Sequence, residues 1–318
     1  MKFAWIKEHA DTEEADSAPT PASAPASASA CAAVAPPPSS SRWPLTVVCQ
    51  VLEVSRGGYY AWRKRPLSAR KTRRAELAEQ VRTVHAQSRG TYGSPRVHAE
   101  LAASGVSVCE NTVARVMREE GVRSVTARKF RCRTTDSAHA HPIADNVLDR
   151  DFAADAPDRK WAADITYVET DEGWLYLAAV IDLCTRRVVG WAMADHLRAE
   201  LCTDALSMAL GRRNPKPGAG LVHHSDRGVQ YACGAYRELL SARGITCSMS
   251  RAGDCYDNAV SESFWGTFKC ELVYLQHYAT RAQAKTSIFE WIECWYNRKR
   301  RHSALGYKSP EEFETELN

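Results

Sequence analysis

The sequence predicts an α/β protein in which a mixed five-stranded sheet flanked by helices follows a small, all-helical and basic module. From Lys160 onward, three apolar segments follow one another closely and two later ones are separated by helical patterns. Ahead of them, residues 42–135 carry 19 basic and 7 acidic residues, a net charge of +12, in short helical segments. A meander of three strands that is extended through helical crossovers gives a mixed sheet.

The predicted core spans residues 158–275, and residues 276–318 are predicted to extend it with helices. Its strands are WAADITYVE, WLYLAAVID, RRVVGWAMA, LVHHS and ITCSMS, with helices beginning near Arg198, Tyr231 and Ala259. In the extension, the aromatic residues Trp291, Trp295 and Tyr296 recur at helical spacing. Such a spacing is more typical of core packing than of a surface on which bases stack.

The amino-terminal 44 residues are predicted to be disordered. Residues 17–40 contain 9 Ala, 6 Pro and 6 Ser, and such a segment cannot bury enough apolar surface to order itself. No apolar run approaches the roughly 18 residues of a membrane span. The acidic amino end is unlike a secretory signal, and the eleven cysteines form no C-x-x-C pair. We therefore expect a cytoplasmic protein with reduced thiols.

Residues 45–125 are predicted to form a helical, helix-turn-helix-like DNA-binding region, joined to the core by a linker over residues 126–157. A first helix is followed by a turn near Glu53–Ser55, and a long helix covers residues 72–87. The next helix has Ser94 as its N-cap and Pro95 at its first position, and the last begins near Glu110 and ends before Gly121.

Several arginines are candidates for DNA contacts. Arg96, Arg115, Arg118 and Arg123 lie in the helical region, and Arg300 and Arg301 lie in a basic run near the carboxyl end that could hold phosphates. The alternative is a helical bundle with a solvated basic surface. The surplus of positive charge favours DNA binding.

Three carboxylates are placed where metal-dependent chemistry would need them. Asp164 lies mid-strand in an apolar segment, where a carboxylate is costly unless a cation or a donor meets it. Asp226 closes the fourth strand, at the carboxyl end where α/β sheets tend to bind ligands. Glu262 follows on the last core helix, and it shares a helix face with Gly266 and Lys269.

An all-oxygen set of ligands suits Mg²⁺ or Mn²⁺. Two such ions about 3.5–4 Å apart would activate an attacking oxygen and stabilise a leaving oxygen in phosphodiester chemistry. Other polar residues lie close to these acids in the sequence. His223 and His224 either polarise the site or pack in the strand, and Asp182 is expected to serve a turn, or to support the site, rather than to bind metal.

Four segments together resemble a known family. They are WAADITYV, HHSDRGVQY, DNAVSESFWGTFK and YNRKRRHSALGYKSP. With VSRGGYYAW and GTYGSPRVHAEL, they are similar to the retroviral-integrase-like DDE transposases of bacterial insertion sequences, in particular the catalytic-frame product of the IS-three family. The resemblance runs from about Leu45 to the carboxyl end. It implies a ribonuclease-H-like core, metal binding by Asp164, Asp226 and Glu262, and a DNA contact near the ends by Lys269.

The resemblance also implies what the protein does and what it binds. The family nicks a transposon end and uses the freed 3′-hydroxyl to attack DNA, so the expected partners are transposon ends, target DNA and further copies of the chain. An upstream-frame helix-turn-helix product is a further expected partner. Two alternatives remain: an inactive or truncated copy that acts only as a DNA-binding protein, and a nuclease without strand transfer. The Ala/Pro/Ser-rich insertion departs from the family pattern.

Overall fold

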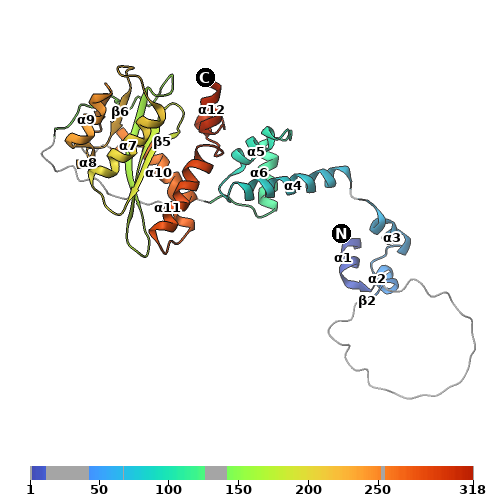
Figure 1. The fold of residues 1–318 in the computed structure, drawn as a ribbon. Helices are drawn as coiled ribbons and strands as arrows, with labels where there is room; N and C mark the ends of the chain where they lie inside the picture. Colours follow the sequence, from blue (N-terminus) through green and yellow to red (C-terminus); the bar gives the residue numbers. More distant parts are fainter. Residues whose placement is uncertain (1, 12–42, 67, 126–141, 252–254, 318) are drawn as a thin grey trace, which may run out of the picture. The chain divides into compact units, whose positions relative to one another are not determined.

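The computed structural model describes residues 2–11, 43–66, 68–125, 142–251 and 255–317 (Figure 1). It divides into two compact units, residues 1–75 and residues 76–318. The first unit holds α1 (Lys2–His9), β1 (Ala10–Asp11), β2 (Trp43–Pro44), α2 (Leu45–Val51) and α3 (Arg56–Lys64). The boundary between the units falls within α4 (Ala69–Gln87).

The second unit combines two more helices with the sheet domain. The helices are α5 (Ser94–Ala103) and α6 (Glu110–Glu119). The strands are β3 (Lys160–Val168), β4 (Leu175–Asp182), β5 (Val188–Ala194), β6 (Val222–Ser225) and β7 (Thr246–Met249). Around and after them lie α7 (Ala199–Arg213), α8 (Val229–Ala232), α9 (Gly234–Ala242), η1 (Cys255–Asn258), α10 (Ala259–Glu271), η2 (Val273–Leu275), α11 (Arg281–Phe289), η3 (Glu290–Tyr296), η4 (Ser303–Leu305) and α12 (Pro310–Leu317).

The first unit corrects the prediction that residues 1–44 are disordered. Residues 2–11 form α1 and β1, and the side chain of Ile6 is fully buried. Ile6 packs in one cluster with Leu45, Val48 and Tyr59, which come from α2 and α3. An apolar contact across the insertion stabilises this helix, and the composition of the insertion gives no sign of it. The rest of the predicted disordered segment, residues 12–42, lies outside the described residues.

The five-stranded sheet has the order β5-β4-β3-β6-β7. β3, β4 and β5 form an antiparallel meander, whereas β6 and β7 add in parallel on the other side of β3. The five predicted strands and the mixed pairing are therefore confirmed, with shifts of one or two residues at their ends. At Gly190 in β5 a Cβ atom would lie 2.2 Å from the carbonyl oxygen of Ala205, so only glycine lets α7 pack this closely.

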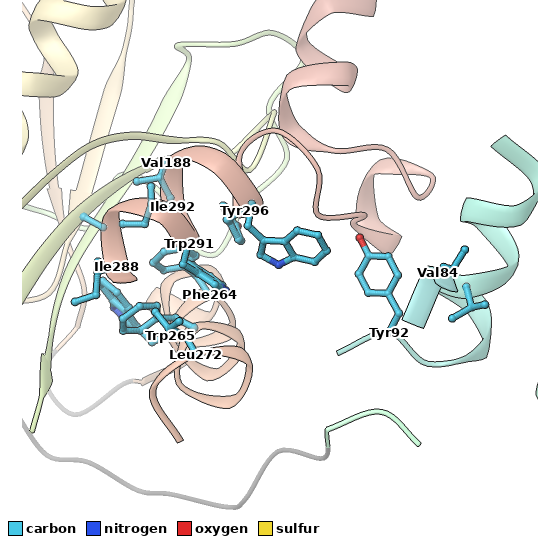
Figure 2. Packing of buried hydrophobic residues seen from close by; sticks show 14 of the residues in the cluster. Val84, Tyr92, Val188, Phe264, Trp265, Leu272, Ile288, Trp291, Ile292 and Tyr296 are labelled. Atoms are coloured by element: carbon cyan, nitrogen blue, oxygen red, sulfur yellow. The ribbon is translucent and has the colours of Figure 1, made fainter. Parts of the chain in front are cut away.

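Helices cover both faces of the sheet. Alternate residues of β3 point to opposite faces, because a strand has a side-chain period of two. Ala163 packs in the cluster formed with α7 and α9, whereas Val168 packs in the cluster formed with α10, α11 and η3. In the second cluster the rings of Phe264, Trp265 and Trp291 lie close together (Figure 2). The prediction that Trp291, Trp295 and Tyr296 are core residues is confirmed.

Two predicted boundaries are wrong. The residues predicted as a linker, 126–157, include 142–157, which pack against the core: Leu148 is buried with Ala162 and Leu183. Residues 126–141 lie outside the described residues. The predicted helical region 45–125 is also not one module, since α2 and α3 belong to the first unit and α5 and α6 to the second. Its helices are otherwise confirmed, although Gly93, rather than Ser94, is the N-cap of α5.

No helix in the described part of the chain is long and apolar enough to cross a membrane.

Candidate active site

Asp164 lies in β3, and Asp226 directly follows the neighbouring parallel strand β6. β3 and β6 pair with Ala162 opposite His224. Asp164 and Asp226 each follow that pair by two residues, and both line the same small cavity. Asp164 shares its face with Val168, and this is the face that α10 covers. The two acids therefore lie close together at the carboxyl end of β6.

The pKa of Asp164 shows that the two carboxylates interact. Burial of the carboxyl group is the main cause that raises the pKa of Asp164, and the negative charge of Asp226 raises it further. The backbone N–H of Ile165, 2.8 Å away, donates to the Asp164 carboxylate and partly offsets the rise. The indole N–H of Trp265 also favours the charged form, although it does not reach hydrogen-bond geometry. A carboxylate in this setting favours a nearby cation.

A tight turn fixes the Asp226 side chain. The Asp226 Oδ1 accepts a hydrogen bond of 2.8 Å from the backbone N–H of Gly228. A Cβ atom at position 228 would lie 3.0 Å from the same oxygen, so a larger residue would crowd the carboxylate. Glycine at this position thus lets the chain turn closely around Asp226.

A small cavity of about 20 Å³ lies beside the two acids. That volume is enough for a single water-sized sphere. The cavity is lined by Asp164, Asp226, Tyr167, Tyr176 and Gln230, among others. The two tyrosines and Gln230 are site residues that sequence reasoning missed. Their only signal was position: Tyr167 lies three residues after Asp164, and Gln230 lies four residues after Asp226.

Glu262 lies in the first turn of α10 and is exposed. Desolvation raises the pKa of Glu262, and the charge of Glu262 makes a small contribution to the raised pKa of Asp164. Within the described residues, however, no three carboxylate, histidine or cysteine side chains are close enough to hold a metal ion together. The structure therefore brings Asp164 and Asp226 together and leaves Glu262 at the edge of the pair.

Asp257 anchors the segment that leads into α10. Its carboxylate is fully buried and accepts hydrogen bonds from Asn146 Nδ2 at 2.9 Å, Arg150 Nε at 3.1 Å and the Arg251 N–H at 2.9 Å. Burial alone would raise the pKa of Asp257, but the donors from Arg251 and Arg150 outweigh it and lower the pKa. Asp257 therefore positions the start of α10, and with it Glu262. Its neighbour Asp254 lies outside the described residues.

Lys269 lies beside the acid pair. Its ammonium group lies 5.0 Å from the centre of the Tyr167 ring, and Tyr167 lines the small cavity with Asp164 and Asp226. Tyr167 in turn meets the half-exposed ring of Trp174 edge-on, with the ring centres 4.7 Å apart. A positive charge and a second aromatic ring thus contact Tyr167, which lines the cavity with the acids.

The candidate DNA-binding arginines lie in different surroundings. Arg115 and Arg118 are exposed on α6, on the side opposite the buried Val113 and Val116. Arg96 is half-buried, 3.9 Å from Glu271. Arg115 and Arg118 are therefore placed where DNA could reach them.

Arg300 and Arg301 correct the prediction that they contact DNA. Arg300 is 3% exposed and donates from Nε and Nη2 to both oxygens of Glu271, at 2.8 and 2.7 Å. Arg301 donates from Nη1 to the Tyr307 carbonyl at 2.9 Å and is ion-paired with Glu100. These contacts join segments far apart in the sequence, which is why the basic run alone was misleading.

The two histidines of β6 are structural. His223 Nε2 lies 3.0 Å from the Tyr236 hydroxyl, and the two ring nitrogens of His224 lie 2.9 and 3.1 Å from the hydroxyls of Ser248 and Ser250. Burial lowers the pKa of His223 to about 3 and that of His224 to about 4, so both are neutral at physiological pH. They pack the strand beneath Asp226.

Asp182 serves a turn, as predicted. Its carboxylate accepts from the backbone N–H groups of Asp158, Cys184 and Thr185 at 2.7, 3.0 and 2.8 Å. The Thr185 hydroxyl also donates to it at 3.0 Å. Burial nevertheless raises the pKa of Asp182.

Models of known protein families match most of the second unit. An integrase core domain matches residues 154–255, a second integrase core domain matches residues 243–310, and an HTH-like domain matches residues 72–130. The last match covers most of α4 together with α5 and α6.

Curated relatives cover most of the chain. The insertion element IS600 uncharacterized 31 kDa protein of Shigella sonnei is 46% identical over 84% of this chain and 97% of its own length. The transposase InsF for insertion sequence IS3A of Escherichia coli K12 is 43% identical over 85% of this chain and 93% of its own length. Among solved structures, the HTLV-2 integrase catalytic core domain in complex with magnesium (dimeric form) is 13% identical. Its TM-score is 0.38, over 51% of this chain and 99% of that chain, too distant a likeness to add to the argument.

Proposed function

Because the chain belongs to the family of IS3-type insertion-sequence transposases, we propose that Asp164, Asp226 and Glu262 are the active-site acids with which it cleaves and joins DNA. The observation that carries this proposal is the register of β3 and β6. This pairing supports the proposal because Asp164 lies in β3 and Asp226 directly follows β6, so the two acids line one small cavity. Glu262 lies in the first turn of α10, and its negative charge contributes to the raised pKa of Asp164.

The acid pair fits a divalent cation. Asp164 and Asp226 offer only oxygen ligands, and burial together with the charge of Asp226 raises the pKa of Asp164. We propose that they hold Mg²⁺ or Mn²⁺, two ions in the active complex, and that Glu262 completes the set of ligands. Bound there, the metal would supply Lewis-acid stabilisation of charge on a phosphodiester and lower the pKa of an attacking water or hydroxyl.

The residues around the acids have roles of their own in this proposal. Lys269 places a positive charge beside the acid pair, where it would bind a phosphate of the DNA end. Asp257 holds the start of α10 through Asn146 and Arg150 and so orients Glu262. Gly228 fixes the Asp226 carboxylate through its backbone N–H.

Positioning of the DNA is assigned to the exposed side of α6, where Arg115 and Arg118 are one turn apart. Contacts of this kind fix the protein on the duplex without reading its sequence. Specific recognition of the transposon ends is assigned to an upstream-frame helix-turn-helix partner, with several copies of the chain assembling on the DNA. The chain alone should therefore bind DNA with strong salt dependence and little preference for ends.

The test is an assay of labelled end DNA with Mg²⁺ and a target plasmid. Joined product supports a transposase, cleavage without joining indicates a nuclease, and binding alone indicates an inactive copy. Asp164→Ala, Asp226→Ala and Glu262→Gln should each abolish cleavage and joining while leaving binding nearly intact. Asp204→Asn, which removes an exposed acid on α7, is the matched control. Near-native joining by any of the three active-site variants would remove that residue from the proposed site.

A further inference from the structure

A second, larger cavity lies on the neighbouring side of α10. Its volume is about 530 Å³, which is room for several tens of water molecules. Its walls come from four parts of the second unit: the start of α5 with the residues before it, Ser124 and Val125 after α6, the side of α10 that carries Ser263, Gly266 and Thr267, and the segment from Arg300 to Tyr307. Ser263 and Gly266 are exposed, so the cavity can be reached from solvent.

The cavity wall has more positive than negative charge. Glu271 is its acidic side chain, and Arg300 occupies both Glu271 oxygens with hydrogen bonds of 2.8 and 2.7 Å. Arg96, the second arginine of the wall, lies 3.9 Å from the same carboxylate. One carboxylate thus faces two guanidinium groups, and it is already engaged by one of them. The wall therefore carries one more positive charge than negative charge, which favours binding of an anion.

The charged residues around the cavity do not balance its excess of positive charge. Burial and the charges of Arg300, Arg96 and Arg186 lower the pKa of His302 to about 2, so His302 is neutral. Desolvation and then the charge of Arg300 lower the pKa of Arg96. Arg301, by contrast, is neutralised by its ion pairs with Glu100 and Glu312. The unbalanced charge is therefore localised at the cavity.

The floor of the cavity is built so that a ligand can approach. A Cβ atom at Gly266 would have no atom within 4 Å, so the space over this helix turn is open. The hydroxyls of Ser263 and Thr267 lie one turn apart beside it, and both are hydrogen-bond donors that suit an anion. Gly266 lies one turn from Glu262 and one turn from Lys269, so the cavity adjoins the proposed active site.

We infer that this cavity binds a phosphate group of the DNA backbone, which Arg96 contacts while Arg300 and Glu271 hold the wall in place. The inference rests on the proposed function, because it places the strand that passes over Glu262 and Lys269. A guanidinium group with hydroxyls and an open helix turn is the kind of donor set that holds phosphates. Arg96 therefore acts from a built cavity and not from a freely solvated helix face.

Binding of a labelled short DNA duplex to the full chain, without divalent metal and at several salt concentrations, tests the inference. Arg96→Gln should weaken DNA binding about tenfold. The slope of log K against log salt should become less negative by about 0.9, since one phosphate contact is lost. Arg96→Lys keeps the charge and should retain most of the slope. Arg237→Gln, which removes an exposed arginine on α9 over the other face of the sheet, should leave both quantities unchanged.

Gly266 gives a second, independent test in a position where the fold tolerates a side chain. Gly266→Asn fills part of the opening, and Gly266→Asp fills it equally and adds a negative charge. The Asp variant should bind DNA about tenfold more weakly than the Asn variant at low salt, and the difference should shrink as salt screens it. Equal binding by the two variants, with an unchanged slope for Arg96→Gln, would overturn the inference.

Inorganic phosphate at matched ionic strength distinguishes the source of the anion. If phosphate raised the melting temperature of the wild type but not of Arg96→Gln, while DNA binding were equal in both, the cavity would bind a free anion and the DNA assignment would be wrong. These binding measurements need no DNA cleavage. They can therefore be interpreted even if the tests of Asp164, Asp226 and Glu262 disprove the proposed active site. If the cavity proved not to bind a DNA phosphate, the cleavage and joining tests of the three acids would still hold.

Discussion

Two pairs of aspartates in the sheet domain differ in the groups that surround their carboxylates. Asp182 and Asp257 are fully buried, and each accepts several hydrogen bonds from fixed donors. Asp164 and Asp226 are half-buried, and burial together with the negative charge of Asp226 raises the pKa of Asp164. A carboxylate whose oxygens are occupied by backbone donors stabilises a turn, whereas two that repel each other at a strand end favour a cation.

Acids that stabilise a turn therefore differ physically from the acids that we propose bind a cation. All four residues lie in strands, at strand ends or in the loop before a helix, and each has the same ionisable group. What separates them is the set of fixed donors around Asp182 and Asp257 and the like charge beside the half-buried Asp164. The account therefore predicts opposite effects for substitutions in the two pairs.

The largest effect is expected on activity. Asp226→Asn should lower DNA joining by about a thousandfold or more, because several kcal/mol of transition-state stabilisation depends on the bound metal. The measurement is the initial rate of joined product at saturating Mg²⁺. A reduction of less than tenfold would place Asp226 with the structural acids.

The next largest effect is on stability. Asp182→Ala leaves three backbone N–H groups and one hydroxyl without their acceptor, so the free energy of unfolding should fall by about 3 kcal/mol. For a unit of this size the melting temperature should fall by about 6–12 °C. Thermal unfolding followed by circular dichroism checks this, and an unchanged melting temperature would contradict the role given to Asp182.

Asp164→Asn should act in the opposite direction. The substitution removes a charge that is destabilised by burial and by Asp226, so the metal-free protein should gain about 1 kcal/mol of stability. Its melting temperature in chelator should rise by about 2–4 °C. A fall comparable to that of Asp182→Ala would mean that the two pairs do not differ as described.

The smallest effect concerns Lys269, beside the acid pair. Lys269→Gln should make the slope of log K against log salt for DNA binding less negative by about 0.9 and leave the melting temperature unchanged. Arg198→Gln, at an exposed position before α7, is a control for the loss of one charge. Equal slopes for the Lys269 variant and the wild type would make Lys269 a surface residue without a DNA contact.

Local patterns predicted much of the sheet domain. Strands such as LVHHS are short apolar runs between turn signals, and the position of Asp226 at the end of one follows from the same pattern. That Asp164 lies beside Asp226 depends on the pairing of β3 with β6. No property of either segment alone sets this register.

The features that sequence reasoning missed depend on contacts between distant residues. The burial of Ile6 needs α2 and α3, across an insertion whose composition suggests disorder. The burial of Arg300 needs Glu271, 29 residues earlier, and Tyr92 accepts a hydrogen bond of 2.8 Å from the Arg301 N–H across 209 residues. A basic run has the same sequence whether it faces DNA or a buried glutamate.

Asp164 and Asp226 are proposed to form a cation site, whereas Asp182 and Asp257 are not. The most direct measurement is the melting temperature of the wild type, Asp164→Asn, Asp226→Asn and Asp182→Asn as Mg²⁺ is added, since an ion that binds only the folded state raises it. The account predicts a rise for the wild type and for Asp182→Asn, from a lower starting point in the latter, and no rise for the other two. An equal rise in all four proteins would contradict it.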